Sequence, residues 1–143
     1  MMTDSHLSPG EGRHVCRLFI ATLADGTPVR NGELADRLGV DPATVTETVK
    51  RFDDAGLARH EPYTGTKLTD RGEQIARRLV WRRCLVQQFF ETTAGLSFTD
   101  DDAFWVASVV SPDQFNGLDE HLSRPCDDRC VATSLTDCDR LSG

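Results

Sequence analysis

The spacing of apolar residues along the chain predicts a mainly α-helical protein. Over most of the sequence, apolar side chains recur every three or four residues, as they do on the buried face of a helix. The stretches with this spacing are 13–23, 33–38, 42–55, 70–93, 99–110 and 114–122. In the stretch 42–55, Val45, Val49 and Phe52 form the expected buried stripe. The first eleven residues show no such pattern, and we expect a loose tail there.

Turn and cap residues place the second and third helices close together. Gly39 can take the left-handed conformation that ends a helix. Asp41 is a favoured N-cap, and Pro42 suits the first helical position because its missing N–H costs nothing there. Two short strands, 59–61 and 66–68, then flank a four-residue turn. Helix, tight turn, helix and ribbon in this order predict a winged helix-turn-helix, a module that lays one helix in the major groove of DNA.

The helix over 42–55 is the expected recognition helix, and the ribbon over 59–68 is the expected wing. With the apolar stripe turned to the core, the outer face of the helix carries small and polar side chains. The alternative is an ordinary small α/β segment, but the cap, the outer-face threonines and the cationic wing all occur in the order that a winged helix requires. The outer-face residues are Ala43, Thr44, Thr46, Glu47, Lys50 and Arg51.

The net charge of −7 at pH 7 is compatible with DNA binding, because the acidic residues are unevenly distributed. Residues 11–83 carry 13 Lys and Arg against 11 Asp and Glu, whereas residues 84–143 carry 3 against 11. The expected DNA-binding half is therefore slightly basic and can contact phosphates. Acidity combined with only two lysines resembles the composition of proteins from salt-accumulating halophilic archaea.

The chain is long enough for one compact domain, or for a small domain with an appendix. We expect a DNA-binding domain over 12–73, a helical dimerisation domain over 74–123 and an acidic, cysteine-containing tail over 124–143. No apolar run reaches membrane-spanning length, and the first residues lack the regions of a signal peptide. We therefore expect a cytoplasmic protein with no membrane partner.

The helices after the wing hold more aromatic residues than a small DNA-binding domain can cover. Because two-fold proteins read two half-sites on adjacent turns of DNA, a dimer interface is the expected use of these residues. The alternative is that they close a core within one chain. The residues expected at the interface are Trp81, Leu85, Phe89 and Trp105.

The sequence resembles the diphtheria-toxin-repressor family of iron- and manganese-dependent transcriptional regulators. The resemblance runs from about residue 8 to residue 125 and rests on four segments in the family's order and spacing. They are PVRNGELADRLGVDPATVTETVKRFDDAGL, YTGTKLTDRG, IARRLVWRRCLVQQFF and SPDQFNGLDEHLSRP. The resemblance implies a homodimer that binds operator double-stranded DNA and represses metal-uptake genes when it carries a divalent metal. It also implies that Arg30, Thr64 and Lys67 face DNA beside the recognition helix.

The positions that match the family's metal ligands hold unsuitable side chains. They are Arg13, Cys16, Arg83 and Gln87, followed by Asp102, Val106, Val109 and Val110 in one register of the next helix or by Phe104, Ala107 and Ser108 in the other. Valine cannot coordinate a cation, and a buried arginine opposes one. We therefore expect no iron or manganese at the family's usual place.

Cysteines near the C-terminus offer a different chemistry. Cys126, Cys130 and Cys138 lie within thirteen residues of one another, and His121 lies five residues upstream. Thiolates and imidazole suit zinc, so we expect zinc or another thiophilic divalent metal at these four residues. A reversible thiol switch at Cys126 and Cys130 is one alternative, and a flexible tail with idle thiols is another.

Together these patterns predict a homodimeric, DNA-binding transcriptional regulator controlled by a metal or by oxidation at the cysteine cluster. No arrangement typical of an enzyme active site is recognisable, so we expect no catalytic activity. Two alternatives remain open. One is a DNA-binding dimer without an effector, and the other is a protein-interaction subunit that pairs with a metal-competent paralogue.

Overall fold

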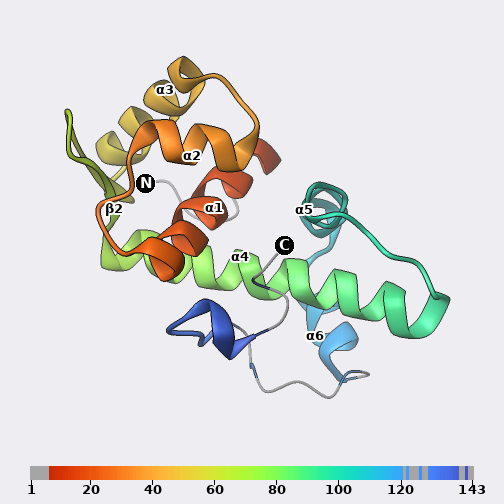
Figure 1. The fold of residues 1–143 in the computed structure, drawn as a ribbon. Helices are drawn as coiled ribbons and strands as arrows, with labels where there is room; N and C mark the ends of the chain where they lie inside the picture. The colour runs from red at the N-terminus through yellow and green to blue at the C-terminus, as the bar shows by residue number, and fades with distance from the viewer. Residues whose placement is uncertain (1–6, 121, 123–125, 127–128, 139–140, 142–143) are drawn as a thin grey trace.

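A computed structural model of the chain describes residues 7–120, 122, 126, 129–138 and 141. The helices are α1 (Pro9–Asp25), α2 (Asn31–Leu38), α3 (Pro42–Asp54), α4 (Asp70–Phe89), α5 (Asp100–Val109) and α6 (Pro112–Glu120), and the strands are β1 (Ala58–Glu61) and β2 (Gly65–Leu68). The expected fold class, a mainly α protein with an N-terminal winged helix-turn-helix, is confirmed. Figure 1 shows α4 running across the molecule, with α1, α2, α3 and the wing toward one end and α5 and α6 toward the other.

Helix α1 begins earlier than expected, because residues 8–11 form a helix start that the apolar pattern does not reveal. The Ser8 hydroxyl accepts a hydrogen bond from the Glu11 N–H at 3.1 Å, and the Glu11 carboxylate accepts one from the Ser8 N–H at 3.1 Å. This reciprocal pair is a capping box, and Pro9 occupies the first helical position. The expectation of a loose tail through residue 11 is therefore wrong for residues 9–11.

The helix-turn-helix forms from the predicted signals. Gly39 ends α2 with φ 67°, and its N–H donates to the carbonyl of Ala35 at 2.9 Å. Asp41 stands at the N-cap of α3 with extended backbone, although its side chain makes no capping hydrogen bond. The stripe of Val45, Val49 and Phe52 is buried, which leaves the opposite face of α3 to solvent.

The wing is an antiparallel pair of strands that also touches the segment before α2. Ala58 pairs with Leu68 at the base, and Thr66 forms a further bridge with Val29 through two backbone hydrogen bonds of 2.7 and 2.9 Å. At Gly65 a side chain is excluded, because a Cβ there would lie 2.5 Å from the Val29 carbonyl oxygen. The wing is thus seated on the entry to α2.

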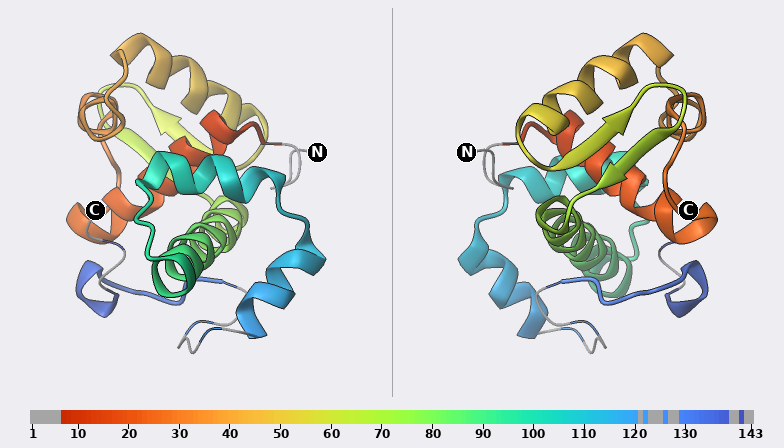
Figure 2. Two further views of the ribbon diagram at one scale, coloured as in Figure 1. Left: turned by 90° about the vertical axis from the view of Figure 1, so that its right-hand side faces the viewer. Right: turned by 90° about the vertical axis from the view of Figure 1, so that its left-hand side faces the viewer.

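Helix α4 buries apolar residues on more than one side. Toward α1 it contributes Ile75, Val80 and Cys84 to the main core, and toward α6 it contributes Trp81 and Leu85 to a second cluster. Figure 2 shows α5 and α6 on different sides of this helix. The chain then passes through a π-helical turn, Phe90–Ala94, which ends at Gly95 as expected.

Two residues expected at the dimer interface are instead internal. Trp81 is 5% exposed and Leu85 is fully buried, and the Trp81 ring lies 6.2 Å from that of Phe115 in α6. The sequence pattern could not show this, because α6 reaches α4 only through the turn that follows α5. Trp81 and Leu85 therefore close a core within one chain, which was the alternative to a dimer interface.

The C-terminal strap, residues 129–138 and 141, packs against the main core. Cys130, Ala132 and Leu141 are at most 5% exposed and join the cluster built on α1 and α4. The Arg77 guanidinium of α4 donates to the carbonyls of Cys130 and Ala132 at 2.9 and 2.8 Å. The alternative of a flexible tail is therefore wrong for this segment.

Truncating Leu141 should reveal this packing. We expect Leu141→Ala to lower the free energy of unfolding by about 2–4 kcal/mol, because it removes a buried side chain and leaves a cavity. Val131→Ala is the matched control, since Val131 is exposed in the same strap. Urea denaturation measures both changes, and equal small losses in the two variants would contradict the docking of the strap.

Candidate nucleic-acid interface

The surface formed by the outer face of α3 and the wing is the candidate nucleic-acid interface. The two elements lie side by side at one end of the molecule (Figures 1 and 2). The predicted DNA-facing residues on it that are exposed are Arg30, Ala43, Thr44, Glu47, Lys50, Arg51, Thr64 and Lys67, and Thr46 is half-buried. The structure therefore brings all of the predicted DNA-facing residues to one end of the folded molecule. Their contact with DNA stays a prediction.

Local contacts distinguish the side chains on this surface. The Thr46 hydroxyl donates to the Pro42 carbonyl at 3.0 Å, so its outward lone pairs remain as acceptors. Arg51 lies 3.5 Å from the Glu11 carboxylate, which partly neutralises it. Tyr63, which the sequence pattern did not single out, stands fully exposed at the wing tip with φ 66°. Asn31 was also missed, and it lies between the wing and α3.

The positions matched to metal ligands lie where α1, α4 and α5 meet, and an ion cluster occupies part of this junction. The Asp100 carboxylate of α5 is 2.7 Å from the Arg17 guanidinium of α1 and 3.4 Å from the Arg83 guanidinium of α4. Gln87 donates to the other carboxylate oxygen at 3.0 Å. Arg13 pairs with Asp101 as well. One turn of α5 is thus tied by charge to two other helices.

Arg83 stays charged at this junction although it is 1% exposed. Burial by itself lowers the pKa of Arg83, but the nearby Cys84 and Asp100 raise it, and the net direction is upward. Guanidinium keeps its proton in proteins in any case. A buried cation of this kind needs its carboxylate partner, because an unpaired charge in the interior is costly.

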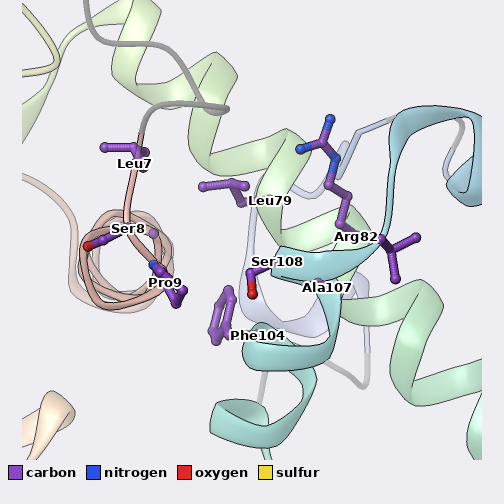
Figure 3. A pocket seen from close by; sticks show the side chains of 10 residues that line it. Leu7, Ser8, Pro9, Leu79, Arg82, Phe104, Ala107 and Ser108 are labelled. Atoms are coloured by element: carbon purple, nitrogen blue, oxygen red, sulfur yellow. The ribbon is translucent and has the colours of Figure 1, made fainter.

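In the second alignment register, the positions matched to the family's metal ligands line a cavity. Phe104, Ala107 and Ser108 of α5 line a space of about 290 Å³, together with Leu79 of α4 and the first residues of α1. Figure 3 shows these side chains around the opening. The Ser108 hydroxyl donates to the Trp105 carbonyl at 2.6 Å, so its proton is already engaged. The lining that the structure gives this space is largely apolar.

The cysteine cluster is only partly brought together. Cys130 is buried, Cys126 and Cys138 are half-buried, and His121 lies outside the described residues. Burial raises the pKa of the Cys130 thiol, and a neutral thiol is a poor nucleophile and a poor metal ligand. Within residues 7–120, 122, 126, 129–138 and 141, no group of three or more His, Cys, Asp and Glu side chains is placed to hold a metal ion.

This chain is similar in sequence to known DNA-binding transcriptional regulators. Residues 20–66 match the family described as iron dependent repressor, N-terminal DNA binding domain. The HTH-type transcriptional regulator MntR of Lysinibacillus sphaericus is 28% identical over 116 residues, which are 81% of this chain and 75% of that protein. MntR of Bacillus subtilis is 30% identical over 94 residues, which are 66% of this chain and 58% of that protein.

Solved structures share the fold. A manganese-dependent transcriptional repressor in complex with manganese superposes with a TM-score of 0.69 at 24% identity, over 78% of this chain and 51% of that one. ScaR with bound Zn²⁺ gives 0.67 at 20% identity, over 86% and 63%. The expected resemblance to the diphtheria-toxin-repressor family is confirmed. The chain spans little more than half the length of several of these relatives.

The comparisons correct the expectation about the cofactor. The sequence led us to expect zinc or another thiophilic metal at Cys126, Cys130, Cys138 and His121, with iron and manganese excluded from the family's usual place. This expectation is contradicted, because the solved structures with the same fold include a manganese-dependent repressor that holds manganese. The reasoning failed because cysteine spacing alone does not show how the thiols pack: Cys130 is buried, and the described cysteines form no group placed to hold a metal ion.

No helix in the described part of the chain combines the length and the apolar character needed to cross a bilayer. Even α4, at 20 residues the longest helix described, carries repeated arginines.

The ion cluster can be tested through its carboxylate. We expect Asp100→Asn to lower the free energy of unfolding by about 3 kcal/mol, because it leaves the buried Arg83 without a compensating charge. Asp101→Asn is the control: this side chain is 54% exposed, and a solvent-screened pair contributes little. Urea denaturation of both variants gives the comparison, and an Asp100→Asn variant as stable as the control would argue against the cluster.

Proposed function

We propose that this protein is a homodimeric transcriptional repressor of the metal-responsive class, a regulator rather than an enzyme, which acts in the cytoplasm on operator DNA. The observation that carries the proposal is that the polar face of α3 and the wing are both exposed at the same end of the folded molecule. The family match over residues 20–66 falls on this same part and supports it. The expected division into a DNA-binding part (12–73) and a dimerisation part (74–123) follows the same plan.

Sequence reading is assigned to the first turns of α3. Thr44, Thr46 and Glu47 are the side chains proposed to meet base edges in the major groove, where hydroxyl and carboxylate groups can distinguish base pairs. Arg51 and Lys67 are proposed to contact phosphates, which fix orientation without reading sequence. The acidic residues concentrated after residue 84 leave this surface able to approach DNA.

The second copy is proposed to dock on the exposed apolar residues of the helical half. Trp105 is 64% exposed and Val109 is 81% exposed, one turn apart on α5. Tryptophan is enriched among the residues that carry most of the binding energy at protein interfaces. With Trp81 and Leu85 internal, the proposed interface rests on Trp105 and the half-buried Phe89. Each copy would contribute one reading head, the surface formed by α3 and the wing. Two copies joined in this way would occupy two half-sites.

Two changes in the reading head should separate the two kinds of contact. Lys67→Ala should weaken binding to all duplexes alike and reduce the slope of log affinity against log salt by about 1, because one phosphate contact is lost. Thr46→Ala should instead change the preference among duplexes. Fluorescence anisotropy across a salt series measures both effects.

The control for Lys67→Ala is Arg129→Ala, which removes an exposed charge from the C-terminal strap. This control should bind DNA as the wild type does. Wild-type affinity and salt dependence in Lys67→Ala, or equal losses in both variants, would contradict the proposed reading surface.

A charge placed on the proposed dimer surface should produce monomers. We expect Trp105→Asp to be monomeric at micromolar concentration and to bind DNA at least about tenfold more weakly, because one half-site is lost and an interface centre carries most of the binding energy. Sedimentation velocity measures the mass, and Val131→Asp in the strap is the control. A wild type that sediments as a monomer, or a dimeric Trp105→Asp, would overturn this assignment.

A further inference from the structure

A continuous chain of side-chain hydrogen bonds runs from the wing to the recognition helix. His60 Nδ1 of β1 lies 3.0 Å from Thr66 Oγ1 of β2. The Thr66 hydroxyl donates to Asn31 Oδ1 at 3.2 Å. Asn31 Nδ2, at the start of α2, donates to Thr46 Oγ1 at 3.4 Å. The Thr46 hydroxyl donates in turn to the Pro42 carbonyl at 3.0 Å.

The number of protons on each group decides which partner donates at each step of this series of hydrogen bonds. A hydroxyl carries a single proton, and the Thr46 proton is used on the Pro42 carbonyl, so Thr46 must accept from the Asn31 amide. That fixes the Asn31 carbonyl oxygen toward Thr66, whose own proton is then used on Asn31. His60 must therefore donate through Nδ1–H, which also fixes its tautomer. A flipped Asn31 amide would require the Thr46 hydroxyl to leave the Pro42 carbonyl, so the assigned orientation makes one hydrogen bond more.

Thr66 is in a position to support the wing without touching DNA. Its side chain has no exposed area, and its backbone N–H and carbonyl both pair with Val29. Asn31 is half-buried between the two elements. A change of DNA preference caused by replacing Thr66 must therefore act through the position of other groups.

A second contact holds the wing to the opposite end of α3. The His60 backbone N–H donates to the Asp53 carboxylate at 2.8 Å, in the last turn of that helix. At His60 and Thr66 the wing is thus tied to the first turns of α3 through Asn31 and Thr46, and to its last turn through Asp53. Two ties at separate points fix an angle, whereas one would leave a hinge.

We propose that Asn31 and Thr66 are positioning residues that set the angle between the wing and the recognition helix, and thereby set how strongly the protein prefers its operator over other DNA. The inference rests on the proposed function. Groups held in the bound geometry before association lose less conformational freedom on binding. This gain in affinity applies only to operator DNA, where the helix and the wing make their contacts at the same time. Non-specific electrostatic binding needs no fixed angle between them.

The test compares Thr66→Val, which keeps the shape and removes the hydroxyl, with Thr66→Ser, which keeps the hydroxyl. Asn31→Ala is a second variant, at a half-buried site less critical for folding. The probes are a duplex that the wild type selects from a randomised library and an unrelated duplex of equal length. We expect Thr66→Val and Asn31→Ala to bind the selected duplex about tenfold more weakly, the scale of one or two lost hydrogen bonds, and the unrelated duplex within about twofold of the wild type. Thr66→Ser should retain the preference.

The outcomes separate the inference from the function on which it rests. If the wild type selects no sequence from the library, the proposed function fails and the inference falls with it. If the wild type selects a sequence and both folded variants prefer it as strongly as the wild type does, the inference alone is wrong. If Thr66→Val does not fold, by thermal melting, Asn31→Ala decides. Equal losses on both duplexes would show a purely structural role and would also overturn the inference.

Discussion

The Asp100 carboxylate, which is 16% exposed, joins the two halves of this protein, and the arrangement of the rest depends on it. It receives guanidinium groups from α1 and α4 while itself belonging to α5. An interior charge is tolerated only with such partners, so the three helices cannot separate without exposing or stranding an ion. Because α1 also supports α2 and α3, the direction in which the reading head points is linked to the position of the helical half. The C-terminal strap closes the opposite side of α4 through Arg77.

Under the proposed function, this arrangement lets a small chain present one surface to DNA and another to a second copy. The reading surface is polar and carries Thr46 and Lys67, whereas the face of α5 carries Trp105 and Val109. The rigid helix α4 runs between them, so a second copy docked on α5 would hold its own reading head at a defined distance. The fold is shared with a manganese-dependent transcriptional repressor, although the junction of α1, α4 and α5 here contains arginines.

Local signals made the reading head predictable. Gly39, Pro42 and the stripe of Val45, Val49 and Phe52 act within one or two helical turns, so sequence spacing was enough to place α2, α3 and the wing. The start of α1 was missed although its capping box is equally local, because Ser8 and Glu11 lie outside the apolar pattern. The same inspection of caps at every helix start would have found it.

Contacts between distant segments were not predictable in this way. The burial of Trp81 depends on Phe115, and the burial of Leu141 depends on a strap that returns to α4 and α1. Asn31 makes its contacts 15 and 35 residues away, so nothing in its immediate neighbours marks it. The expectation of zinc failed for another reason: cysteine spacing describes what a segment could bind but not how the segment packs, and Cys130 is buried in the main core.

The most direct measurement of the central claim is NMR chemical-shift mapping of the protein titrated with a duplex selected from a randomised library. A reading surface built from α3 and the wing predicts that the largest backbone amide shifts fall within residues 42–54 and 58–68, with weaker changes in α2. Shifts concentrated in α5, α6 or the C-terminal strap, with α3 unperturbed, would contradict it.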